Sequence, residues 1–171
     1  SGLHGNKMVT VFNYHPEGNV DKRTNLYLLQ SEDMGKSWQT IDGKTVSTPL
    51  STKQHPALVH DFEKENKLVY LNDLNFDKDV NPIVLAVVSH HHQPGPQGNP
   101  REWMIFHWKN GKWNEQRVTA STHNYDMGSL YIEKENWTII GPTEPGPQAY
   151  GTGGEMAVWE SKDEGKTWGK T

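Results

Sequence analysis

The octapeptide SEDMGKSW at residues 31–38 returns near the other end of the chain as SKDEGKTW at residues 161–168. A short Asp side chain can accept backbone N–H bonds in a turn, Gly permits a positive φ, and Trp packs between sheets. The octet therefore predicts a structural turn that holds sheets together and does no chemistry. The residues expected to build the two turns are Ser31, Asp33, Gly35 and Trp38, and Ser161, Asp163, Gly165 and Trp168.

Between the octets, the chain alternates short strand-like runs with turn signals, and helical periodicity is almost absent. Sixteen Gly and ten Pro among 171 residues agree with many turns. The pattern predicts an all-β protein. The expected strands are residues 8–14, 25–31, 67–73, 82–89, 102–108, 129–133, 137–143 and 155–161.

A larger repeat surrounds each octet: strand, tight turn, strand, long Pro/Gly loop, strand, tight turn and a Trp-led strand. Trp38, Trp113 and Trp168 are equivalent in this unit, as expected for four-stranded β-propeller blades with loop insertions. The first copy is expected to lack its first strand. Since a closed propeller needs about four to eight blades, the chain is interpreted as a partial propeller of about three blades, truncated at both ends, with other blades of the parent protein or another chain beside it. The expected blades are roughly residues 1–50, 55–120 and 121–171.

The composition excludes several classes of protein. A net charge of -4 does not indicate general nucleic-acid binding, and no apolar run is long enough to span a membrane. The chain has no Cys, which excludes a disulfide scaffold and zinc–thiolate sites. No bidentate Glu follows the octets as a calcium loop would require, so neither a metal nor a cofactor is expected. The chain opens on SGLHGNK without Met, which suggests an excised segment, so a missing export signal is uninformative.

If each octet joins strands three and four of a blade, the loops between strands two and three emerge at the opposite face. Binding residues on rigid scaffolds concentrate on such long loops. Seven of the nine His lie on or beside these loops and the linkers between blades. A binding or catalytic site is therefore predicted at the face opposite the octets, which we call the mouth. It is expected on loops 14–24, 89–102 and 141–155 and on linkers 47–56 and 119–128.

Among these segments, HNYDMGSLY at residues 123–131 gives the strongest indication of a functional site. His123 and Tyr125 suit proton transfer and are the first catalytic candidates, with His15 as a third. For His123 and Tyr125, the alternative is a structural hydrogen-bond network at a blade corner. For His15, the alternative is an ordinary exposed loop. Three consecutive His at 90–92 point alternately and make a poor metal site. The expected substrate-binding residues are Arg23, Arg101, His91, Asp126, Gln148 and Tyr150.

The octets resemble the Asp-box, or BNR, repeat of sialidases. The runs FNYHPEG, PGPQGNPREW, HNYDMGSLYI and GPTEPGPQAYGTGGEMAVW extend the likeness to the BNR-repeat proteins of polysaccharide-degrading bacteria. These include propeller ulvan lyases and rhamnosidases, and many are labelled sialidases or neuraminidases. The resemblance implies a secreted or periplasmic propeller of about seven blades. It further implies a His/Tyr pair that transfers protons and an Arg, with another His, that neutralises a uronate carboxylate.

Three functions remain open at this point. The first is a polysaccharide lyase or glycoside hydrolase acting on an acidic, uronate-containing poly- or oligosaccharide, with the 171-residue chain alone expected to be inactive. The second is a sialidase-type exo-glycosidase, which needs three converging Arg. The chain has only Arg23, Arg101 and Arg117, and Arg117 falls in a predicted outer strand. The third is a non-catalytic glycan-binding or scaffolding propeller, because fold does not dictate function.

Overall fold

Strands are the only regular elements of the computed structural model apart from two short 3-10 turns, and all 171 residues are described. Each of the eight expected runs is a strand, which confirms the all-β prediction. The strands are β1 (Gly2–His4), β2 (Lys7–Tyr14), β3 (Thr24–Ser31), β4 (Trp38–Gln39), β5 (Thr45–Val46), β6 (Leu58–His60), β7 (Leu68–Phe76), β8 (Pro82–Ser89), β9 (Glu102–Lys109), β10 (Lys112–Ala120), β11 (Ser129–Glu133), β12 (Asn136–Gly141), β13 (Ala157–Ser161) and β14 (Gly169–Lys170). The 3-10 turns are η1 (Pro16–Gly18) and η2 (Pro96–Gly98).

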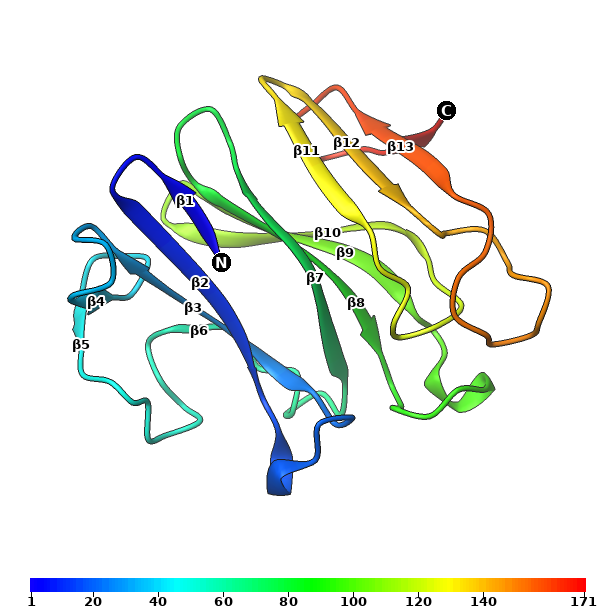
Figure 1. Ribbon diagram of the computed structural model, residues 1–171, viewed down its shortest axis with the longest axis horizontal. Coiled ribbons are helices and arrows are strands. Elements are labelled where there is room, and N and C mark those ends of the chain that lie inside the picture. Colours follow the sequence, from blue (N-terminus) through cyan, green and yellow to red (C-terminus); the bar gives the residue numbers. More distant parts are fainter.

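The strands form three antiparallel sheets that stand side by side in an open arc (Figure 1). The first has the order β1-β2-β3-β4-β5, with β6 added to β3, the second β10-β9-β8-β7 and the third β11-β12-β13-β14. Up-and-down sheets of this kind, arranged radially, are propeller blades. The fold is therefore that of a partial β-propeller.

The first blade corrects one expectation, because its first strand is present. β1 pairs with β2 through Leu3↔Met8 and its neighbours, and His4 ends this strand. A three-residue run, Gly-Leu-His, is too short to show alternation in the sequence. Its pairing comes from the tight turn that follows, in which Gly5 has a φ of 60°.

Both octets are turns closed by their own Ser and Asp side chains. Ser31 Oγ accepts the Gly35 N–H at 2.8 Å, and the Asp33 carboxylate accepts the Ser37 N–H at 2.9 Å. The second octet repeats the pattern, with Asp163 accepting the Thr167 N–H at 2.9 Å. The prediction that both Asp side chains accept backbone N–H bonds is confirmed.

The Trp residues of the octets depart from the prediction. Trp38 and Trp168 are only partly buried, whereas a Trp that packs between sheets, as the octet predicts, would be largely buried. Trp168 packs against the edge of the core formed by blades two and three, and its indole N–H donates to the Gly165 carbonyl at 3.1 Å. The octet Trp therefore covers the turn from outside, and the core between blades is filled by other residues.

The hydrophobic core consists of two clusters, one between each pair of neighbouring blades. β8 is buried along its whole length and contributes to both clusters by alternation. Ile83, Leu85 and Val87 face the third blade, where they share a cluster with Trp103 of β9 and with Trp137 of β12 in the third blade. The intervening residues Val84, Ala86 and Val88 face the first blade. Because successive side chains of a strand point to opposite faces, the continuous apolar run of β8 is explained by burial on both sides.

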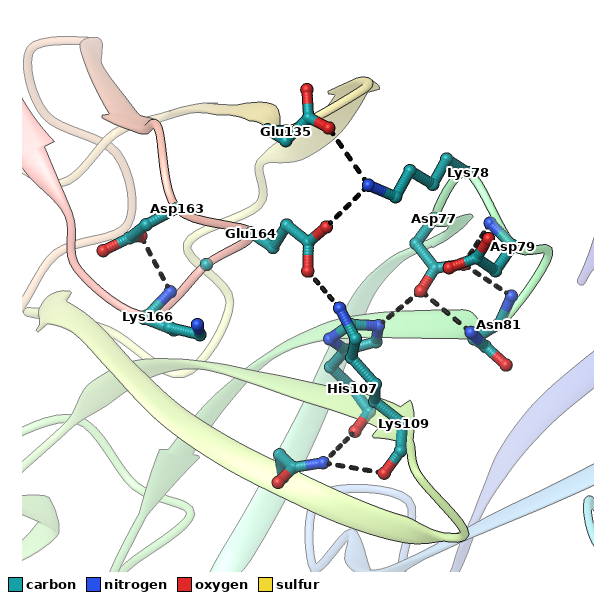
Figure 2. A network of polar contacts seen from close by, with 12 residues as sticks. Asp77, Lys78, Asp79, Asn81, His107, Lys109, Glu135, Asp163, Glu164 and Lys166 are labelled. Carbon is teal, nitrogen blue, oxygen red and sulfur yellow. Dashed lines mark hydrogen bonds and ion pairs between the residues drawn. The ribbon is translucent and has the colours of Figure 1, made fainter.

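At the octet end, polar groups join the second and third blades. Figure 2 shows Lys78 between Glu135 and Glu164, with Nζ–O distances of 3.0 and 3.2 Å, while Glu164 also pairs with Lys109. Beneath this network, His107 Nε2 lies 2.8 Å from Asp77 Oδ2, and both side chains are buried. Lys78 and Lys109 thus connect the β7–β8 turn and β9 to two turns of the third blade, whereas His107 and Asp77 pair within the second blade.

A glycine substitution tests how closely the second octet approaches the core. Gly35 and Gly165 both have positive φ, at 86° and 80°. A Cβ on Gly165 would lie 2.5 Å from Trp137 and 2.6 Å from Ile105, whereas on Gly35 its closest contact would be 3.7 Å. We expect Gly165→Ala to lower the free energy of unfolding by roughly 1–3 kcal/mol more than Gly35→Ala, through overpacking. Urea denaturation of both variants measures the difference, and equal losses would contradict it.

Acid titration tests the octet hydrogen bonds. Accepted bonds from Ser37 lower the pKa of Asp33 to about 2, and bonds from Thr167 lower the pKa of Asp163 to about 2, from 3.8. A lowered folded-state pKa contributes stability that is present above the ordinary pKa and is lost as pH falls toward the folded value. We expect the urea midpoint to fall between about pH 4 and pH 2, and less steeply for the Asp33→Ala/Asp163→Ala protein. The same dependence of the urea midpoint on pH in the two proteins would contradict this prediction.

Candidate functional site at the blade mouth

Four connections gather at the end of the arc opposite the octets. They are the β2–β3, β8–β9, β10–β11 and β12–β13 segments (Figure 1). They contain the residues proposed from the sequence as catalytic or substrate-binding. The antiparallel up-and-down order places them together, because every second turn of a blade returns to the same end.

The β10–β11 connection is held by the buried carboxylate of Asp126. Its Oδ2 accepts the His123 N–H at 3.0 Å and the Ser121 hydroxyl at 2.8 Å, while Oδ1 accepts the Gly153 N–H at 3.1 Å from the β12–β13 loop. The side chain is fully buried. Asp126 was predicted to bind substrate, but this geometry makes it the anchor of two mouth loops.

Arg101 is a second buried ion, and carbonyl groups surround it. Its guanidinium is held by Asn124 Oδ1 at 2.9 Å through Nε, by the Gly95 carbonyl and Asn99 through Nη1, and by the Gln93 carbonyl through Nη2. Burial lowers the pKa of Arg101. Every nitrogen already has a partner, and only 2% of the residue is exposed. The predicted role as a carboxylate ligand does not fit this position, since Arg101 instead orders the β8–β9 loop.

Unlike Arg101, Arg23 has a guanidinium group whose terminal nitrogens have no hydrogen-bond partner. The guanidinium carbon lies 5.3 Å from the ring centre of Tyr125 and 5.8 Å from that of Tyr70. Its Nε donates to the Val20 carbonyl at 2.9 Å, and no carboxylate pairs with it. Contacts with aromatic faces orient a guanidinium while leaving its donors free. The two terminal nitrogens of Arg23 can therefore take a bidentate acceptor.

The two tyrosines beside Arg23 hold their protons at neutral pH. The Tyr70 hydroxyl donates to the Asp21 carbonyl at 2.6 Å and the Tyr125 hydroxyl to the Asp21 carboxylate at 3.1 Å. Burial raises the pKa of Tyr70 to about 12 and also raises the pKa of Tyr125. The rings meet edge to face at 5.2 Å. A protonated phenol next to a guanidinium can donate a hydrogen bond or a proton to bound substrate.

His123 joins this cluster with a defined tautomer. Its ring centre lies 5.8 Å from that of Tyr125, and its Nδ1 accepts the Tyr125 N–H at 3.1 Å. Burial lowers the pKa of His123, so the neutral ring is favoured. A neutral imidazole with Nδ1 as acceptor carries its proton on Nε2. His123 therefore presents a hydrogen-bond donor, and its lone pair is already used.

The remaining predicted residues lie outside this cluster of Arg23, Tyr70, Tyr125, Asp21 and His123. His15 precedes η1 on the same connection as Arg23, and its ring makes no hydrogen bond. His91 stacks on His92 with ring centres 4.6 Å apart. Tyr150 lies 6.0 Å from the Arg101 guanidinium, and Gln148 accepts the Gly151 N–H through its backbone carbonyl.

Sequence reasoning missed Tyr70 and Asp21. Tyr70 was read as an ordinary strand residue, and Asp21 as part of a polar loop. The available signal was position, because Tyr70 follows closely after the start of β7 at the mouth end, and Asp21 lies two residues before Arg23. The structure brings together no metal-binding group of three or more His, Asp or Glu, and it contains no helix long and apolar enough to cross a membrane.

The family model of the BNR repeat-containing family matches residues 4–121, more than half of the chain. The chain belongs to this family. No curated protein matches it.

Solved structures add a likeness in fold. A PL25 ulvan lyase, described as a new family of polysaccharide lyase, superposes with a TM-score of 0.76 at 13% identity, over 100% of this chain and 40% of the lyase. The same lyase bound to -[GlcA(1-4)Rha3S]- gives 0.77 at 13% identity with the same coverage. Polysaccharide lyase Uly1 gives 0.62 at 15% identity, over 96% of this chain and 34% of Uly1. This BNR-repeat chain thus spans about two fifths or less of those lyases.

The anchoring role of Asp126 in this BNR-repeat chain can be tested directly. Asp126→Ala leaves several buried donors without an acceptor, so the free energy of unfolding should fall by roughly 2 kcal/mol or more. The amides of His123 and Gly153, which donate to Asp126, should exchange hydrogen faster. Asp79→Ala, an exposed acidic residue of the β7–β8 turn, is the matched control. Unchanged amide exchange in Asp126→Ala would contradict the role.

Proposed function

We propose that this chain forms the mouth of a carbohydrate-active propeller that cleaves an acidic, uronate-containing polysaccharide by β-elimination. The observation that carries the proposal is the guanidinium of Arg23, oriented by Tyr70 and Tyr125 with its terminal nitrogens free. A planar guanidinium matches a carboxylate in bidentate geometry. The polysaccharide lyases that share this fold are consistent with the proposal.

In this scheme Arg23 binds the uronate carboxylate and stabilises the negative charge that develops when the C5 proton leaves. The Nε2–H of His123 donates a second hydrogen bond to the same charge. Tyr125, whose pKa is raised by burial, transfers its proton to O4 as the C4–O4 bond breaks and the C4–C5 double bond forms. His15 takes the C5 proton, because its imidazole is free of hydrogen bonds and lies on the loop that carries Arg23.

The sialidase-type alternative is disfavoured by the arginines. Arg101 is buried among carbonyl groups, and Arg117 pairs with Glu102 at 2.7 Å on β10. Only Arg23 remains free for a carboxylate, whereas that chemistry needs three converging arginines. A glycan-binding propeller without catalysis stays an outcome of the test below.

The test is an assay of the protein, in its longest natural form, on glucuronate-containing polysaccharides. Ultraviolet absorbance of an unsaturated uronate reports a lyase, and reducing ends without that absorbance report a hydrolase. We expect Arg23→Ala to lower kcat/KM by roughly a hundredfold or more, since one transition-state charge contact is lost. Arg117→Ala, which removes an arginine outside the cluster, should leave kcat/KM within about twofold. Glycan binding without product would overturn the enzyme proposal.

The division of roles between the two histidines is tested by the same assay. His15→Ala should lower kcat by roughly a hundredfold or more, as expected for loss of a general base. His123→Gln, which keeps a side-chain donor, should retain more activity than His123→Ala. A His15→Ala protein with unchanged turnover would refute the base role of His15.

A further inference from the structure

His60 lies between two carboxylates where the first and second blades meet. Its Nδ1 lies 2.5 Å from Glu115 Oε1 on β10, and its Nε2 lies 2.6 Å from Glu65 Oε1 in the β6–β7 connection. His60 itself ends β6, which pairs with β3 of the first blade. One imidazole thus connects the first blade to the outer strand of the second. We call these three residues the His60 clamp.

The clamp is complete only when His60 is an imidazolium ion. An ionised carboxylate accepts hydrogen bonds and has no proton to give, so both ring nitrogens must donate, whereas a neutral imidazole carries a single N–H. Hydrogen bonding to Glu115 above all, and also to Glu65, raises the pKa of His60 from its ordinary value of 6.5. This is the effect expected of two opposite charges at contact distance.

Aromatic rings form the rest of the surroundings of His60. The imidazole stacks on Phe62 with ring centres 4.2 Å apart, and the ring of Phe106 on β9 lies at 6.5 Å. Only 20% of the His60 side chain is exposed. The charges that face the imidazole are therefore those of Glu65 and Glu115, and water has limited access to replace a lost contact.

Loss of one proton from His60 opens one of the two contacts, because one carboxylate then faces a lone pair. Glu65 keeps a second cation, since Lys67 Nζ lies 2.7 Å from its other oxygen, whereas Glu115 has no other ion pair. Opening of the Glu115 contact releases the second blade from β6. Opening of the Glu65 contact releases the β6–β7 connection. Either event loosens the segment from residue 60 to residue 67.

The same segment bonds to the backbone beside the Arg23 cluster. The Val69 N–H donates to the Arg23 carbonyl at 2.9 Å, and the Thr24 hydroxyl donates to the Lys67 carbonyl at 2.9 Å. Tyr70 comes next in the chain, and its ring centre lies 5.8 Å from the Arg23 guanidinium. The β6–β7 connection therefore positions one side of the candidate site.

We propose that the His60 clamp is a pH-sensitive switch, which holds the Arg23 cluster in order while His60 is protonated and loosens it when the imidazole becomes neutral. A group whose pKa is raised in the folded protein contributes stability that is present below its unfolded pKa and is lost as pH rises through the folded value. The loosening is therefore expected on the alkaline side. The inference rests on the proposed function only in its effect on turnover, because the clamp orders the mouth whether or not the mouth is catalytic.

NMR titration of the imidazoles tests the charge state of the clamp. In the protein in its longest natural form, we expect His60 to titrate above 6.5, and Glu115→Gln to move its midpoint downward by removal of one negative charge. Glu133→Gln, an exposed carboxylate at the end of β11, should leave the midpoint unchanged. A His60 midpoint at or below 6.5, or one that Glu115→Gln does not move, would overturn the switch.

Hydrogen exchange tests whether the charge orders the segment. His60→Gln keeps a side-chain donor but cannot become charged. We expect it to lower the protection of the Val69 amide by about threefold or more at about pH 6 and to match the wild type above the His60 midpoint. His90→Ala, an exposed histidine beside the β8–β9 loop, should match the wild type throughout. A loss of protection that is equal at every pH would show packing alone and overturn the switch.

Turnover on the polysaccharide separates the switch from the proposed function. His60→Gln should lower kcat/KM by about threefold or more below the His60 midpoint and leave it unchanged above the midpoint. The same pH profile of kcat/KM in His60→Gln and in the wild type would refute regulation of the site by the clamp. PH-dependent protection without turnover in any variant would support the clamp and refute the lyase.

Discussion

Burial of β8 on both faces is the constraint from which the rest of the structure follows. Its alternate side chains fill the core toward the first blade and the core toward the third. A strand in this position cannot slip by one residue, because every side chain would then change core. The register of β8 sets the directions of β7 and β9, and so determines where the loops at their ends meet. The mouth is thus positioned by packing between blades, and the octets close turns at the far end.

The mouth itself depends on two buried ions of opposite charge that do not touch each other. Asp126 is solvated by hydroxyl and backbone N–H groups, and Arg101 by carbonyl and amide oxygens. A buried charge is costly unless hydrogen bonds replace its water, so each ion forces its loops into one conformation. The loops are thereby ordered before any ligand arrives, and binding requires less loss of conformational entropy.

The sequence predicted the fold well because its signals are local. A turn of the form S-x-D-x-G uses contacts within seven residues, and the alternation of strands needs only neighbouring positions. The site was predicted less well, since the role of a charged residue depends on burial. Arg23 and Arg101 are the same residue type on equivalent loops, yet one is free and the other is 2% exposed. Likewise, the tautomer of His123 depends on one backbone N–H, which residue type cannot reveal.

The three arginines of the chain show how one type of side chain behaves in three different electrostatic environments. Arg117 lies on an outer strand and pairs with Glu102, where solvent leaves little net stabilisation. Arg101 is desolvated and bound by neutral oxygens, so its charge serves the folding of one loop. Arg23 is held by aromatic rings, which orient the guanidinium without consuming its terminal donors. A cation kept rigid and unpaired is unfavourable for stability alone, and this is the physical reason for assigning it to an anionic ligand.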